Sequence, residues 1–147
     1  MTLSLQEISD RFEIQDLIVE YCDVIDKCDI DRLDDIFTAD AFIDYSAMGG
    51  EKGDLECIKA FLKAALPMFK NTQHLISNYQ IKVAGDKASG RIMCFNPMEF
   101  DDEKTGNPLI CLGLWYIDEY VRTKQGWRIK SRVEEKSYQF NPPTNKN

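Results

Sequence analysis

The hydrophobic pattern of the chain changes near its midpoint, and this change constrains the fold more than any other feature. In the first half, apolar side chains recur at steps of three and four residues, which is the period of one helix face. The first such set comprises Ile14, Leu17, Ile18, Tyr21, Ile25 and Cys28. In the second half, apolar and polar side chains alternate, as in half-buried strands. Helices followed by a run of strands predict an α+β fold.

Capping signals predict two further helices in the first half. Asp29 or Asp31 can cap a short helix that carries the apolar side chains of residues 33–37, because a carboxylate accepts hydrogen bonds from the free N–H groups of a first turn. Asp54 can cap a third helix, and Pro67 would end it, because proline removes a backbone donor and clashes with the preceding turn. We therefore expect about three helices before the main strands.

Strand signals fill the rest of the chain. Gly85-Asp86 and Lys124–Gly126 are short turn signals that predict hairpins between long strands. The predicted strands lie in residues 41–53, where the strand runs into a loop at Gly49-Gly50, and in residues 74–84, 87–100, 108–123 and 127–140. In the second of these, one face is expected to hold Leu75, Ser77, Tyr79, Ile81 and Val83. A long, curved antiparallel sheet with the helices on its concave side would enclose a cone-shaped cavity.

The length of the chain predicts a single domain. A protein of 147 residues buries about 70% of its unfolded surface, which is enough for one hydrophobic core. We expect one domain over residues 1–147, with its ordered part at about 8–140 and a polar tail at 141–147.

Charge and cysteine content argue against several classes of protein. The net charge of −7 disfavours nucleic acid as a partner, because phosphate binding needs a basic surface. No apolar run approaches the roughly 18 residues of a membrane span. The five cysteines include no C-x-x-C pair, which indicates free thiols in a reducing cytoplasm. With one histidine, the chain offers no tetrahedral zinc set.

Asp26 and His74 are the first candidates for a functional site. Asp26 lies about 120° around from Ile14 on a regular helix, at the flank of the apolar stripe. It is therefore either a solvated flank residue or a carboxylate that faces a pocket. A buried carboxylate is costly without a partner, so the second alternative requires His74 or Arg132 nearby. His74 is the only histidine, and a lone histidine is more often structural than catalytic.

Several other side chains allow two interpretations. Tyr21 lies on the apolar stripe, either as a core aromatic or as a pocket hydroxyl. Arg128, Arg132 and Lys136 are spaced to share one strand face, either at a pocket or as a solvated basic row. Met93, Phe95, Met98, Trp115 and Tyr116 could line an apolar pocket, or they could belong to the core or a dimer face. The acidic clusters at residues 101–103 and 134–135 are predicted to be surface turns.

Two segments carry a resemblance to a known family. "IQDLIVEYCDVIDKCDIDRLDDIFTADAFIDYS" at residues 14–46 and "GLWYIDEYVRTKQGWRIKSR" at residues 113–132 resemble the nuclear transport factor 2-like superfamily. Within it, the SnoaL-like, scytalone dehydratase-like group is the most similar, and the resemblance covers about residues 8–140. The fold hosts enzymes, binding proteins and structural subunits, so the resemblance implies the fold more strongly than the activity.

The resemblance also implies roles for individual residues. In the dehydratase-like members, an aspartate near the end of the first helix contacts a histidine at the start of a long strand, and Asp26 and His74 occupy these positions. Tyr21 stands where members have a tyrosine or lysine, and Arg132 matches an arginine of the dehydrochlorinases. The candidate substrate-binding residues are Tyr45, Phe95, Asn96, Met98, Trp115 and Lys136. Of these, Lys136 matches a basic residue of the bile-acid dehydratase. Asn96 departs from the aspartate of the bile-acid dehydratase, and the second histidine of scytalone dehydratase has no counterpart here.

These residue types suit the removal of a proton next to a leaving group. Histidine titrates near neutral pH and can act as the base. An aspartate on one ring nitrogen fixes the tautomer and stabilises the imidazolium. A tyrosine can polarise a carbonyl, and an arginine can balance negative charge. None of these steps needs a metal, nucleotide or flavin.

Three functions follow as hypotheses. The first is a cofactor-independent lyase, dehydratase or isomerase acting on a small hydrophobic substrate, polycyclic or aromatic. The second is a binding protein without chemistry, and the third is a structural subunit of a complex like the ring-hydroxylating dioxygenases. The segment at residues 110–117 is apolar on both faces. Because members of the family commonly oligomerise through the outer side of the sheet, this segment predicts a homodimer or homotrimer.

Overall fold

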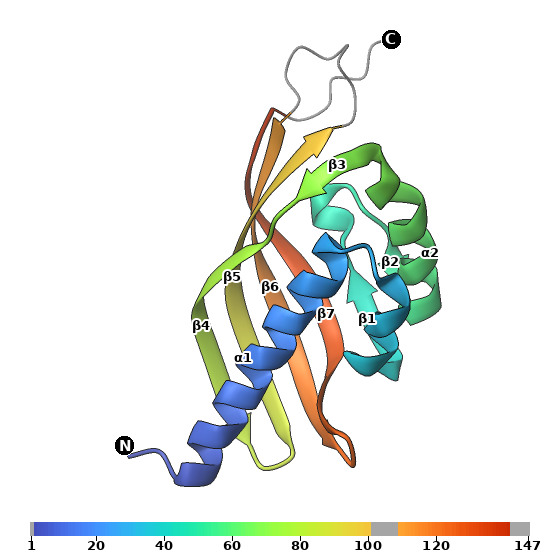
Figure 1. The fold of residues 1–147 in the computed structure, drawn as a ribbon. Coiled ribbons are helices and arrows are strands. Elements are labelled where there is room, and N and C mark those ends of the chain that lie inside the picture. Colours follow the sequence, from blue (N-terminus) through green and yellow to red (C-terminus); the bar gives the residue numbers. More distant parts are fainter. Residues whose placement is uncertain (1, 101–108, 142–147) are drawn as a thin grey trace.

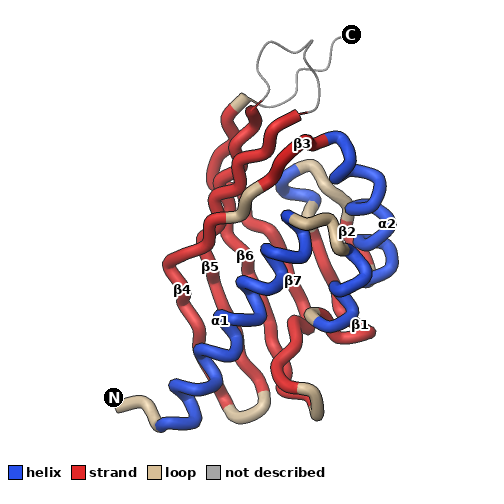
Figure 2. Tube along the Cα trace, viewed as in Figure 1, coloured by secondary structure: helices blue, strands red, loops and turns tan. Residues whose placement is uncertain are grey.

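The computed structural model of the chain describes residues 2–100 and 109–141. One curved sheet carries the helices on one of its sides, and α1 crosses that side diagonally (Figures 1 and 2). In chain order the elements are α1 (Leu5–Asp26), η1 (Ile30–Asp35), β1 (Phe37–Asp44), η2 (Ser46–Met48), β2 (Lys52–Gly53), α2 (Leu55–Ala65), η3 (Leu66–Met68), β3 (Phe69–Thr72), β4 (Leu75–Ala84), β5 (Lys87–Phe100), β6 (Leu109–Thr123) and β7 (Gly126–Phe140). The predicted α+β class with a curved sheet is confirmed.

The first helix forms where the sequence predicted it. Ser4 and Glu7 make a reciprocal capping box at its start, with distances of 3.1 Å from Glu7 N to Ser4 Oγ and 2.8 Å from Ser4 N to Glu7 Oε2. The apolar stripe from Ile14 to Ile25 is buried against the sheet. Cys28 does not continue this stripe, because the helix ends at Asp26 and Cys28 adopts a φ of 56° and is exposed.

The two other predicted helices differ in regularity. The short one is a 3-10 helix, and Asp29 stands at its N-cap without a side-chain hydrogen bond. Phe37, which the pattern placed on this helix, begins β1 instead. The third helix is confirmed as α2, where the Asp54 carboxylate accepts a hydrogen bond of 2.9 Å from Cys57 N.

The sheet has seven strands in the order β2-β1-β7-β6-β5-β3, with β4 paired to β5. The hairpins at Gly85 and Gly126 are confirmed, and both glycines adopt positive φ, 62° and 101°. The long strands β4 to β7 pair antiparallel, as predicted. The β1–β7 pair is parallel, so the sheet is mixed. The first strand of the chain thus lies beside the last.

Bulges correct two predictions about strand faces. In β4 the register shifts between Ser77 and Gln80, and Asn78 adopts a φ of 50°. An extra residue reverses the alternation, so Leu75 is 50% exposed while Ile76 packs on the core. In β7 the register shifts between Ile129 and Ser131, so Arg128 does not share a face with Arg132 as predicted.

The core fills the space between the concave sheet and the helices. At the end of the sheet near the β6–β7 hairpin, buried Asp10 of α1 accepts hydrogen bonds from Arg122 Nη2 at 2.7 Å and Trp127 Nε1 at 3.2 Å. Within residues 2–100 and 109–141, no helix is long and apolar enough to span a membrane. The predicted acidic turn at residues 101–103, and the polar tail beyond Asn141, lie outside the described residues.

Candidate functional site

A cavity of about 720 Å³ lies over the concave face of the sheet. Its wall is contributed by the end of α1, by η2, by α2 and by the upper parts of β5, β6 and β7. Most of the lining is apolar, with Phe61, Leu66 and Leu112 among the larger side chains. The polar side chains of the lining are Tyr21, Tyr45, Thr72, His74, Asn96, Glu134, Lys136 and Gln139.

Asp26 and His74 meet at the edge of this cavity. Asp26 is the last residue of α1, and His74 directly precedes β4. The His74 Nδ1 atom lies 2.6 Å from Asp26 Oδ1, and the His74 backbone N–H donates to Asp26 Oδ2 at 2.9 Å. The imidazole is 4% exposed and the Asp26 side chain 22% exposed. One carboxylate thus fixes both the ring and the backbone of the histidine.

Asn96 occupies the other side of the imidazole. Its Nδ2 atom lies 3.2 Å from His74 Nε2, and its Oδ1 atom accepts a hydrogen bond of 3.1 Å from Thr72 Oγ1. Thr72 thereby turns the amide N–H toward the ring. The network as a whole assigns the proton to Nδ1 and the lone pair to Nε2. This is the tautomer in which Nε2 can accept a proton.

Tyr21 and Tyr45 bring two hydroxyl groups to the cavity. The Tyr21 and Tyr45 hydroxyl oxygens are 2.7 Å apart, and both side chains are buried. Burial raises the pKa of both residues above the ordinary value for tyrosine. The ring of Tyr21 meets that of His74 edge-on, with 6.3 Å between centroids. Both hydroxyls are therefore neutral, and one of them donates its hydrogen to the other.

Arg132 lies behind the tyrosines and does not line the cavity. Its side chain is fully buried and donates to both carboxylate oxygens of Asp118, at 2.8 and 2.6 Å. Its guanidinium stacks at 4.1 Å from the ring of Tyr21 and at 4.0 Å from that of Tyr116. Arg132 can thus act on a substrate only through these rings.

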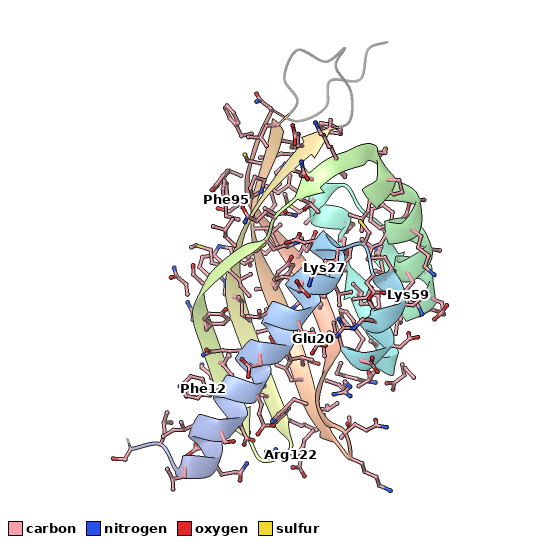
Figure 3. The ribbon with its side chains drawn as sticks, in the orientation of Figure 1. Phe12, Glu20, Lys27, Lys59, Phe95 and Arg122 are labelled. Atoms are coloured by element: carbon pink, nitrogen blue, oxygen red, sulfur yellow. The ribbon has the colours of Figure 1, made fainter. Side chains whose placement is uncertain are left out.

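The remaining predicted residues divide between the two faces of the sheet. Tyr45, Asn96, Met98 and Lys136 line the cavity, whereas Phe95 and Trp115 do not. Phe95 follows Cys94 and precedes Asn96, which both point inward, so strand alternation turns it outward. Figure 3 shows Phe95 projecting from the sheet away from α1 and α2. The Trp115 ring carries the guanidinium of Arg91 at 3.6 Å.

Glu134 is a cavity residue that the sequence prediction missed. Together with Glu135 it was assigned to a surface turn, but both lie within β7. Glu135 is exposed and pairs with Arg91 at 2.6 Å, whereas Glu134 lines the cavity. Burial raises the pKa of Glu134 to about 8, Arg132 opposes this shift, and Asp44 adds to it. Counting two positions along the strand from Arg132 would have placed Glu134 inward.

Within the part of the chain that the structure describes, no group of three or more His, Cys, Asp and Glu side chains forms a metal site. The polar groups of the cavity are those of general acid–base chemistry. An imidazole with a carboxylate partner can take up a proton, the tyrosines can donate hydrogen bonds to an oxygen, and Glu134 can give or take a proton.

The curved sheet, the helices on its concave side and the cavity between them define the nuclear transport factor 2-like class of folds. Residues 6–133 match the SnoaL-like domain, and the chain therefore belongs to this family.

Similar proteins include an uncharacterized protein of Mycobacterium tuberculosis (strain H37Rv). It is 49% identical over 93% of this chain and 92% of its own length. The Kfla4162 protein from Kribbella flavida has a similar structure, with a TM-score of 0.85 and 28% identity over 92% of this chain and 95% of that one. A hexachlorocyclohexane dehydrochlorinase (LinA, type 2) superimposes with a TM-score of 0.78 and 26% identity over 95% and 97%.

Proposed function

We propose that the protein is a lyase, or an isomerase, that abstracts a proton from a small hydrophobic substrate of polycyclic or aromatic type. The observation that carries the proposal is the 2.6 Å contact between His74 Nδ1 and Asp26 Oδ1 at the edge of a cavity of about 720 Å³. Cavities of this size suit ligands of about drug size. The similarity to a protein named as a dehydrochlorinase supports an elimination.

In this proposal, His74 Nε2 takes a proton from a carbon beside an electron-withdrawing group. Asp26 keeps the other ring nitrogen protonated and stabilises the imidazolium that forms. Asn96 donates to Nε2, and the C–H group of the substrate replaces this donor. The hydroxyls of Tyr21 and Tyr45 donate to the oxygen on which negative charge develops.

Arg132 acts as a positioning residue in this scheme. Its guanidinium faces the rings of Tyr21 and Tyr116 while Asp118 holds it from the other side. A cation on the π-face of an aromatic ring is attracted to it by about 0.5 to 2 kcal/mol. Arg132 therefore holds the ring of Tyr21, and with it the hydroxyl of Tyr21, in place without touching the substrate.

The variant His74→Gln tests the base. A glutamine can still donate a hydrogen bond to Asp26 but cannot take up a proton at neutral pH. We expect the rate of product formation to fall by about a hundredfold or more. The assay incubates the protein with a panel of hydroxylated and chlorinated cyclic ketones and detects loss of water or hydrogen chloride by mass spectrometry.

Lys27→Ala is the matched control for His74→Gln. Lys27 follows Asp26 directly (Figure 3), its side chain is 68% exposed and it pairs only with Asp23 in the described structure. This variant should retain the full rate. A His74→Gln protein that is folded and as fast as the unchanged protein would exclude the proposed base.

A binding protein without chemistry is the second candidate function. It is favoured by the Asn96 amide, which already occupies the Nε2 lone pair of His74 at 3.2 Å. In that case His74→Gln would leave ligand affinity unchanged and no product would appear with either protein. Calorimetric titration beside the product assay distinguishes the two candidates.

We also propose that the protein forms a homodimer or homotrimer through the outer face of the sheet. We further propose that it is located in the cytoplasm. Large hydrophobic side chains remain exposed in β4, β6 and β7: Leu75, Leu109, Tyr138 and Phe140. Exposed apolar clusters of this kind commonly mark interfaces. The five cysteines are free, which suits a reducing compartment. Light scattering coupled to size-exclusion chromatography measures the assembly.

A further inference from the structure

Glu134 brings a second ionisable group to the cavity that His74 lines. It lies on β7, whereas His74 precedes β4, and β5 and β6 lie between these strands in the sheet. Three spacings of about 4.8 Å put roughly 14 Å of sheet between these two strands. Glu134 is also further along the sheet, since it pairs with Tyr116 of β6, whereas the row of Leu75, next to His74, crosses β6 at Gly113. Both side chains line the same cavity, so a bound molecule can contact both.

Among the described residues, none donates a hydrogen bond to the Glu134 carboxyl group or forms an ion pair with it. Arg132, two positions before it, is held by both oxygens of Asp118 at 2.8 and 2.6 Å. Lys136, two positions after it, donates to Gln139 Oε1 at 3.3 Å. Glu134 is therefore free to bond to a ligand.

The surroundings of Glu134 favour its neutral form. The ionisable groups that interact with it are Arg132 on β7, Asp44 at the end of β1, Cys94 on β5, Tyr116 on β6, Tyr21 on α1 and Tyr45 before η2. Lys136 on β7 lines the same cavity. Burial raises the pKa of Glu134 to about 8, which Arg132 only partly offsets. Near pH 7 the side chain is thus mainly a carboxylic acid, which has a proton to give.

A neutral acid in the same cavity as a base suits one kind of leaving group. Chloride departs as a stable anion and needs no proton, whereas a hydroxyl group leaves readily only when it is protonated. We propose that Glu134 is the general acid that protonates a departing hydroxyl, so that the substrate is a β-hydroxy carbonyl compound and the reaction is a dehydration. This inference rests on the proposed role of His74 as the base.

The step balances without any co-reactant. His74 Nε2 takes the proton from the carbon beside the carbonyl, and the electron pair of this C–H bond forms the new double bond. The C–O bond breaks, and its oxygen takes the Glu134 proton and leaves as water. The imidazolium then returns a proton through water to the Glu134 carboxylate.

The protonation of Glu134 can be measured without a substrate. Infrared difference spectra between the unchanged protein and Glu134→Gln should show the carbonyl stretch of a protonated carboxylic acid at pH 7. The band should disappear as the pH rises through about 8. A spectrum without this band at pH 7 would overturn the proposal, because an ionised Glu134 has no proton to donate.

A pair of probes that give the same product tests the chemical step. With 3-hydroxycyclohexanone, Glu134→Gln should lower kcat by about a hundredfold or more. With 3-chlorocyclohexanone, the same variant should change kcat less than about threefold, since chloride leaves unprotonated. His74→Gln should lower both rates. Equal losses on both probes with Glu134→Gln would refute the general acid and leave the base standing, whereas unchanged rates with His74→Gln would refute the base.

Discussion

At the scale of single residues, the site depends on how Asp26 uses its two oxygens. One oxygen binds the imidazole of His74 and the other binds its backbone N–H. The side chain that sets the tautomer therefore also fixes the start of β4 against the end of α1. The sequence allowed this pairing to be predicted, because the resemblance to dehydratase-like proteins placed both residues at matching positions.

Strand alternation explains why the predicted positions of Phe95 and Glu134 were wrong. Phe95 and Asn96 were both expected in the cavity, although neighbours on a strand point to opposite faces. Glu134 was missed because two adjacent acidic residues are typical of an exposed turn. On a strand, however, only one of the two is exposed, and here it is Glu135. Sequence composition does not reveal which of Glu134 and Glu135 points inward; the position of a buried neighbour on the same strand does.

The raised pKa of Glu134 predicts a pH-dependent stability. Below about pH 4.5 the residue is protonated in both the folded and the unfolded chain. As the pH rises from about 4.5 to about 8, the unfolded chain loses this proton while the folded protein keeps it. The free energy of unfolding therefore falls, by at most about 1.4 kcal/mol per pH unit from this residue.

Glu134→Gln removes this contribution, because an amide does not titrate. Its stability relative to the unchanged protein should rise between pH 5 and 8 and then level off. Urea unfolding at a series of pH values measures the difference. A difference that is flat over this window would show that Glu134 titrates in the folded protein as it does in the unfolded chain.

At the scale of elements, the hydrophobic period predicted most helices and strands, and glycines predicted the hairpins. The bulges escaped prediction, because one extra residue changes the faces of a whole strand segment without changing its composition. The parallel pairing of β1 with β7 also escaped, since it joins strands far apart in the chain. Both features matter here, because they decide which side chains of β4 and β7 reach the core and the cavity.

The bulge in β4 can be tested at Asn78, which adopts a φ of 50°. A β-branched residue is strained in this conformation, so Asn78→Val should destabilise the protein by about 1–2 kcal/mol. Asn78→Gly is the matched control and should change stability little, because glycine accepts positive φ. Urea unfolding of both variants gives the comparison. Equal stability of the two would mean that the backbone at this position is not held in the left-handed region.

At the scale of the whole molecule, the curvature of the sheet creates the cavity and the helices close one side of it. Residues that are distant in sequence, such as Tyr21, His74 and Glu134, line the same cavity only because of this curvature. The sequence predicted that a cavity would form. Its size depends on the packing of many side chains, which no local pattern encodes.

Ligand binding in the cavity can be tested by filling it. Leu112 lines the cavity from β6, so Leu112→Trp should weaken binding of the neutral fluorescent probe N-phenyl-1-naphthylamine by about tenfold or more, because the added ring occupies the space of the probe. Leu75→Trp is the control, since Leu75 is 50% exposed and does not line the cavity. Unchanged binding by a folded Leu112→Trp protein would place the probe elsewhere.

The most direct test of the site is nitrogen NMR of the histidine ring. Because the chain has one histidine, labelling all histidine with ¹⁵N gives a single pair of ring signals. We predict a protonated Nδ1 with a slowly exchanging, strongly deshielded proton, an unprotonated Nε2, and loss of this pattern in Asp26→Asn. A ring that exchanges its proton freely between both nitrogens, unaffected by Asp26→Asn, would contradict the pairing on which the proposed chemistry depends.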